Sequence, residues 1–135
     1  MISSFIDTSG SYERIFKISG RYKLNSKFDY SKHQSAKNKV MIIFPERSQN
    51  LYNFDVKSSM LQYMTRCWSF DFSLLSVMIE TYDKMKKDII YASTTKKQAD
   101  IEHLLYQHLN KKLVHNIHRM GIEGYWAPLR RWIEE

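Results

Sequence analysis

The chain has 135 residues, 43% of them hydrophobic and 26% charged, which is the length and composition of one globular domain and excludes a disordered chain. A single cysteine excludes an intrachain disulfide and a four-cysteine zinc site. No stretch reaches the roughly 20 apolar residues that cross a bilayer, and the first 20 residues lack the apolar segment of a signal peptide. We therefore expect residues 1–135 to form a single cytoplasmic domain without a membrane span.

The basic excess lies in the first half of the chain. The formal net charge is +7; residues 1–70 carry 11 Lys and Arg against 5 Asp and Glu, and residues 71–135 carry 10 against 9. A local positive field favours anionic partners such as nucleic acid, nucleotide phosphates or anionic lipid. A basic surface that only keeps the protein soluble is an equally good interpretation.

The first predicted element is a strand over residues 15–24, where apolar and polar side chains alternate. Its polar face carries Lys17, Ser19, Arg21 and Lys23. Gly20, within this run, would let a ligand or another backbone approach. Cations beside a hydroxyl suit a phosphate or a carboxylate, whereas the alternative is a half-exposed strand whose polar face meets water.

The next elements are less regular. Residues 25–39 are polar and are predicted to form a loop, and 40–44 form a short buried strand that Pro45 ends. Residues 46–60 are predicted to be irregular. Residues 61–70, rich in aromatic and β-branched side chains, are predicted to form a third strand.

This third strand carries a second basic and aromatic cluster, composed of Tyr63, Thr65, Arg66 and Trp68. Arg66 shares the face of large apolar neighbours, so its charge needs a partner, which is either a ligand or, more commonly, an internal carboxylate. Cys67, on the same predicted strand, is expected to be a buried thiol rather than a nucleophile.

Two amphipathic helices follow. Asp71 is placed to cap the first, whose apolar residues recur at three- and four-residue steps over 72–85 and which ends in a lysine cluster at 84–87. The second is predicted to open at Thr95 with a capping-box spacing and to close at Lys112.

The last predicted strand covers 113–119, and Gly121, Gly124 and Pro128 are expected to break structure before a short tail that contains tryptophan. The resulting order is strand, strand, strand, helix, helix, strand. It predicts the α/β class, with a mixed sheet of about four strands packed by two or three helices.

Among the five histidines, His103 follows Glu102 on the second predicted helix. Neighbouring helical side chains point about 100° apart, so each would act alone, as a general base or as a ligand. Most lone histidines are structural. Asp100 and Glu102 diverge in the same way, and we predict no metal site from the residues alone. Phosphate-loop, dinucleotide, zinc-protease and serine-hydrolase motifs are absent from the sequence.

Three segments together resemble glycosyltransferases of large DNA viruses, marine phages and bacterial surface-polysaccharide clusters. They are 15–24, 63–70, and 100–105 followed by 121–124, and they occur in the expected order. The resemblance implies the second half of a nucleotide-diphospho-sugar transferase (GT-A-like) domain that lacks the N-terminal nucleotide-binding half. It also implies sugar transfer from a nucleotide sugar to a glycan or other acceptor.

The same resemblance assigns roles to residues. It places the donor's phosphates or sugar near Lys17, Ser19, Arg21, Tyr22, Thr65 and Arg66. It makes Glu102 or His103 a base near the acceptor. A divalent metal (Mn²⁺ or Mg²⁺) is implied by analogy, although the chain has no Asp-x-Asp motif, and a homodimer or a partner chain would supply what a partial domain lacks.

Two other function classes fit the sequence. The first is a structural or interaction domain without a catalytic site. The second, less favoured, is a basic nucleic-acid-binding module that uses aromatic stacking groups, namely Tyr12, Tyr22, Phe28 and Tyr30. Steep salt dependence of binding would favour nucleic acid over a sugar nucleotide.

Overall fold

The computed structural model of the protein describes residues 12–48, 61–95, 97–126 and 130–135, which form nine strands and three α-helices. In chain order the elements are β1 (Arg14–Ile18), β2 (Tyr22–Leu24), α1 (Tyr30–Ser35), β3 (Val40–Ile43), β4 (Glu46–Arg47), β5 (Leu61–Gln62), β6 (Cys67–Asp71), α2 (Leu75–Thr94), α3 (Ile101–His108), β7 (Val114–Ile117), β8 (Ile122–Trp126) and β9 (Arg131–Glu134).

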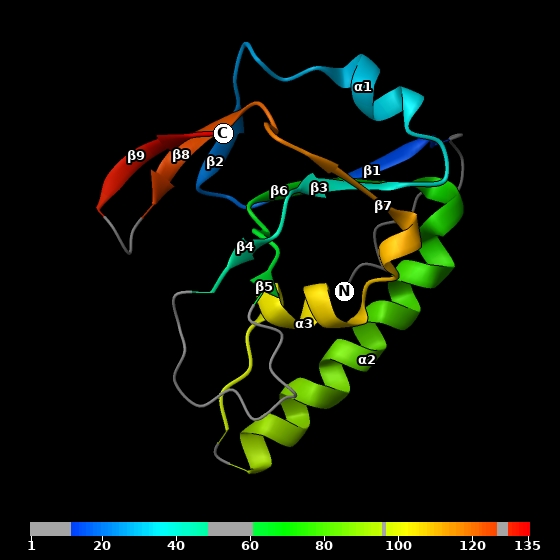
Figure 1. The fold of residues 1–135 in the computed structure, drawn as a ribbon, viewed down its shortest axis with the longest axis vertical. Coiled ribbons are helices and arrows are strands. Elements are labelled where there is room, and N and C mark those ends of the chain that lie inside the picture. The colour runs from blue at the N-terminus through cyan, green and yellow to red at the C-terminus, as the bar shows by residue number, and fades with distance from the viewer. Residues whose placement is uncertain (1–11, 49–60, 96, 127–129) are drawn as a thin grey trace.

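The main sheet has four strands in the order β1-β6-β3-β7. β6 is antiparallel to both of its neighbours, whereas β3 and β7 are parallel. Helices α2 and α3 lie on one face of this sheet and α1 lies over the other (Figure 1). The predicted α/β class and the mixed four-stranded sheet are therefore confirmed, and the described residues add two smaller sheets, β2-β8-β9 and β4-β5.

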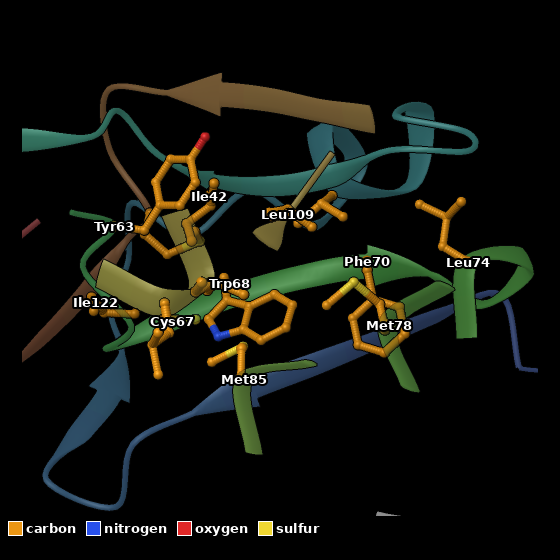
Figure 2. Close-up of a cluster of buried hydrophobic side chains, with 14 residues drawn as sticks. Ile42, Tyr63, Cys67, Trp68, Phe70, Leu74, Met78, Met85, Leu109 and Ile122 are labelled. Atoms are coloured by element: carbon orange, nitrogen blue, oxygen red, sulfur yellow. The ribbon is translucent and has the colours of Figure 1, made fainter. Parts of the chain in front are cut away.

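The core fills the space between the main sheet and α2. β3 is an inner strand whose Val40, Met41 and Ile42 are at most 1% exposed, which explains its uninterrupted apolar sequence. Figure 2 shows Met78 and Met85 of α2 against the rings that β6 contributes, those of Trp68 and Phe70. The periodic apolar stripe predicted for this helix is thus its packed face.

The predicted strand over 15–24 is wrong as a single element. The amide of Ser19 donates to the carbonyl of Arg66, and the amide of Tyr22 donates to the carbonyl of Ser19 in a turn. β6 begins only at Cys67, so β1 loses its ladder partner there, and the chain leaves to pair with β8 as β2. The polar side chains of this run therefore do not share one strand face.

The predicted loop over 25–39 is also wrong in part, because it contains α1. Asp29 caps this helix by accepting from the amides of Ser31 and Lys32. Only His33 is buried in the helix, so it has no apolar stripe that periodicity could reveal. The strand predicted over 40–44 is confirmed as β3.

The third predicted strand, over 61–70, is two strands: β5 at its start and β6 from Cys67 onward. Residues 63–66 connect them, and the amide of Tyr63 donates to the carbonyl of Glu102 in α3 rather than to a strand. Of the predicted irregular stretch 46–60, Glu46–Arg47 forms β4 and residues 49–60 lie outside the described part of the chain.

Both predicted helices exist with shifted ends. Asp71 caps a 3₁₀ turn, Phe72–Leu74, that leads into α2, and α2 continues to Thr94, beyond the lysine cluster. The second helix begins at Ile101 with Asp100 as its cap, because the hydroxyl of Thr95 bonds the last carbonyls of α2 instead.

The strand predicted over 113–119 is confirmed for Val114–Ile117. The predicted break at Gly124 is wrong: Gly124 lies within β8, where a Cβ atom would sit 2.5 Å from the ring of Tyr22. Here glycine permits the close approach of β2 rather than ending a strand. No helix in the described residues is long and apolar enough to span a membrane.

Candidate functional site

Three of the sequence-predicted site residues meet where β1, α3 and the connection before β6 converge. Lys17 Nζ donates to the carbonyl of Thr65, whose hydroxyl donates to Glu102 Oε1 at 2.8 Å. Burial lowers the pKa of Lys17, and the negative charge of Glu102 opposes that shift. Each polar group in this cluster already has a protein partner.

Arg66 forms a second cluster beside the first. Its guanidinium donates to Glu135 Oε1 and lies 4.7 Å from the ring centroid of Trp126 and 6.0 Å from that of Tyr22. Arg66 is only 9% exposed, so an internal carboxylate, rather than a ligand, provides the partner that its buried charge requires.

The other residues singled out from the sequence do not gather with these clusters into an open site. Ser19 contributes its backbone to the turn after β1, and Arg21 is exposed in the same turn. His103 Nδ1 lies 2.7 Å from Oδ1 of Asp100, the N-cap of its own helix. Cys67 is 1% exposed, which confirms the predicted buried thiol, and burial raises the pKa of this thiol to about 11.

A pocket of about 580 Å³ opens on the α1 side of the main sheet, within the roughly 300–1,000 Å³ typical of small-molecule sites. None of the residues predicted from the sequence lines it. Its lining, which we call the basic pocket, consists of Lys27, Asp29, Lys32, His33, Met41, His115, Asn116, Ile117, His118, Arg119 and Met120. The parallel pairing of β3 with β7 brings the second-half residues beside the first-half ones.

Positive charge dominates this lining, which contains Lys27, Lys32 and Arg119 but one carboxylate, Asp29. Lys32 lies 3.6 Å from Asp29, and Lys27 lies 2.8 Å from Glu134, outside the pocket. No carboxylate in the described residues pairs with Arg119. A concave surface with surplus positive charge concentrates field lines and attracts anions.

His33 is the buried polar residue of the lining, at 2% exposure. Its Nδ1 lies 2.8 Å from the hydroxyl of Ser69, and Arg14 Nε donates to that same hydroxyl at 2.8 Å. Arg14 also donates to the carbonyls of Ala36 and Lys39. We call this arrangement the Arg14–Ser69–His33 chain.

The His33 ring is also fixed by packing and by its electrostatic surroundings. It stacks on Phe28 at 5.1 Å between centroids and touches Phe16 at the same separation. Burial lowers the pKa of His33 to about 4, the positive charge of Arg14 adds to this shift, and Asp29 opposes it. His33 is therefore neutral at pH 7.

The donors in the pocket do not suit a hard divalent cation. Mn²⁺ and Mg²⁺ prefer several carboxylate or carbonyl oxygens, and the lining offers a single carboxylate. Elsewhere in the described residues, no three or more His, Cys, Asp or Glu side chains gather as metal ligands would. The metal implied by the sequence resemblance therefore finds no fitting set of ligands in this part of the chain.

The basic pocket was missed by the sequence interpretation because its residues come from a predicted loop and from the end of the last predicted strand. One signal was present: Ser69 is a polar residue within the otherwise apolar run 67–70, and it is fully buried. A buried hydroxyl requires a hydrogen-bond partner, which could have directed attention to the polar groups of neighbouring elements.

Comparison with known proteins adds no family to this picture, since no family model, no curated protein and no solved structure matches the chain.

Proposed function

We propose that this protein binds a phosphate-bearing small molecule in the basic pocket. The observation that carries the proposal is the lining itself: three cationic side chains against one carboxylate around a cavity of about 580 Å³. Anions bind where positive side chains converge and water is partly excluded. In the pocket, Lys27 and Lys32 form exposed ion pairs with Glu134 and Asp29, and Arg119 has no carboxylate partner among the described residues. In the clusters around Lys17 and Arg66, by contrast, the cations are bonded inside the protein.

The cation types suit a phosphate group. Arg119 carries a planar fork that can bind two phosphate oxygens at once, and Lys27 and Lys32 supply mobile point charges at the rim. A concave site favours a compact ligand. Single-stranded nucleic acid instead uses an extended basic groove with exposed aromatic rings, so the small molecule is the better fit.

A nucleotide sugar is the first ligand class to test, because the resemblance to glycosyltransferases implies one and because its diphosphate fits the charge of the pocket. On this proposal the chain would correspond to the second half of a GT-A-like domain. Glu102 and His103, the bases that the resemblance implies, are bonded to Thr65 and Asp100 and do not line the pocket. The proposal therefore assigns binding to the pocket, and sugar transfer needs a separate assay of turnover.

Titration calorimetry with inorganic pyrophosphate, nucleoside diphosphates and nucleotide sugars, with and without Mn²⁺, tests the proposal. The variant Lys27→Gln/Lys32→Gln/Arg119→Gln should weaken binding about tenfold or more, because it removes the charge-assisted contacts. The matched control is Lys84→Gln/Lys86→Gln/Lys87→Gln, which removes the same charge from exposed positions of α2.

The control variant should bind like the wild type. Equal weakening in both variants would show that net charge, not the pocket, attracts the ligand. Failure of the wild type to bind any of these anions would overturn the proposal and favour a structural or interaction domain. Binding to an oligonucleotide that falls steeply with salt would favour the nucleic-acid alternative.

A further inference from the structure

We propose that the Arg14–Ser69–His33 chain holds His33 as a neutral imidazole whose Nε2–H donates a hydrogen bond to a phosphate oxygen of the pocket's ligand. The inference deepens the proposed function and rests on it. It assigns a specificity-determining role to a residue that carries no charge, in a pocket whose charged side chains are mainly cationic.

The Ser69 hydroxyl links Arg14 to His33. Arg14 is a guanidinium that can only donate, so Ser69 Oγ accepts its hydrogen bond. The hydroxyl must place its own proton on an acceptor, because Ser69 is fully buried. His33 Nδ1, at 2.8 Å, is the acceptor that the described residues provide.

The hydrogen bond from Ser69 fixes the tautomer of His33. A ring nitrogen that accepts a hydrogen bond carries no proton, so in neutral His33 the proton resides on Nε2. Nε2 lies on the opposite side of the ring from Nδ1. No described residue bonds Nε2, and His33 belongs to the pocket lining, so this N–H is left for a ligand.

Charged groups around His33 decide whether its ring is protonated. Arg14 from β1 disfavours the charged imidazole, and Asp29 before α1 favours it. The other titratable and charged groups of the pocket are Lys27, Lys32, His115, His118 and Arg119. The cations among these disfavour a further positive charge, and burial acts in the same direction.

The ring is also held in place for this role. Stacking on Phe28, with an interplanar angle of 25°, and contact with Phe16 restrict its rotation. A donor with a fixed direction loses little entropy on binding, and its hydrogen bond adds directional selection that the flexible lysines at the rim cannot supply.

The test is long-range ¹H–¹⁵N NMR of the histidine rings in the wild-type protein. We expect His33 to show an unprotonated Nδ1 and a protonated Nε2 from pH 8 to pH 5. Saturating inorganic pyrophosphate should shift the Nε2–H resonance of His33. His108, which pairs with Asp88 and lies outside the pocket lining, is the internal control and should not respond to pyrophosphate.

Two variants measure the contribution of the chain to affinity. His33→Phe keeps the aromatic packing and removes the donor, and Ser69→Ala removes the group that fixes the tautomer. Both should weaken pyrophosphate binding about tenfold, whereas His108→Gln should leave it unchanged. The tautomer measurement uses the wild type, so it holds even if a variant does not fold.

The outcomes separate the two proposals. A His33 ring protonated on Nδ1, a charged ring at pH 7, or an unmoved Nε2–H at saturating pyrophosphate would overturn the inference and leave the pocket's anion binding intact. If the wild type bound no pyrophosphate or nucleotide at all, the proposed function would fail, and the ligand role of His33 would fail with it.

Discussion

At the scale of single residues, the cations Arg14, Lys17 and Arg66 are each matched to a specific partner inside the protein. Arg66 is paired with Glu135 beneath the Trp126 ring, and Lys17 is bonded to the carbonyl of Thr65. Removing one partner of such a pair leaves the other desolvated, which costs more than an exposed ion pair contributes. These pairs therefore differ sharply from surface salt bridges in their expected effect on stability.

The Arg66–Glu135 pair allows a direct test. Glu135→Gln removes the carboxylate charge facing the buried guanidinium and should lower the free energy of unfolding by about 2–4 kcal/mol. Urea denaturation provides the measurement. The control, Glu123→Gln, breaks a pair whose lysine, Lys23, is 69% exposed, and should cost less than about 1 kcal/mol. Equal effects in the two variants would contradict the burial argument.

The lowered pKa of His33 predicts how the free energy of unfolding depends on pH. Its folded-state pKa of about 4 lies below the ordinary value of 6.5, so the unfolded chain binds more protons between these values. Stability from this group is complete above pH 6.5 and is lost as the pH falls toward 4. The loss is on the order of 2–3 kcal/mol.

Denaturation of the wild type and of His33→Phe at several pH values checks this prediction. The variant cannot bind the extra proton, so its stability should fall less between pH 6.5 and pH 4. Carboxylates titrate in both proteins and cancel in the comparison. Parallel pH profiles would show that His33 titrates alike in the folded and unfolded states.

At the scale of elements, a glycine in a tight place determines how the loop before α1 meets the start of β8. Gly121 adopts φ +75° just before β8, and a Cβ atom there would lie 2.3 Å from the backbone of Phe28. The amide of Asn25 also donates to the carbonyl of Gly121. This contact holds the segment that carries Lys27 and Phe28 to the pocket.

Gly121→Ala should therefore lower the free energy of unfolding by about 2 kcal/mol or more, because it adds backbone strain to a clash with main-chain atoms. Gly20→Ala is the matched control: a Cβ atom there has nothing within 4 Å, and its stability should change by less than about 1 kcal/mol. Thermal unfolding compares them. A harmless Gly121→Ala would mean that the 25–28 segment moves aside freely.

The secondary-structure elements differ in how well the sequence predicts them. β3 and α2 were recognisable because burial on both faces of a strand leaves an uninterrupted apolar run, and burial of one stripe of a helix leaves a periodic apolar pattern. The turn between β1 and β2 depends on where the partner strand β6 begins, and the strand β8 depends on Tyr22 lying over Gly124. Both features depend on contacts between segments that are distant in the sequence, and the local pattern of apolar and polar residues does not encode such contacts.

At the scale of the whole molecule, the candidate site depends on topology. Pairing β3 with β7 joins Lys27, Lys32 and His33 of the first half to Arg119 of the second. The charge bias of the first half pointed toward an anionic partner, but it could not indicate which cations converge. The predicted residues Lys17, Thr65 and Glu102 do come together, in a cluster that joins β1 to α3.

The most direct test of the central claim is to map the bound anion on the wild-type protein by amide chemical shifts during titration with inorganic pyrophosphate and a nucleoside diphosphate. We predict saturable shifts concentrated at residues 27–33 and 115–120, around the basic pocket. Saturable shifts confined to Lys17, Thr65, Arg66 and Glu102 would place the site where the sequence interpretation put it, and the absence of any saturable shift would contradict an anion-binding function.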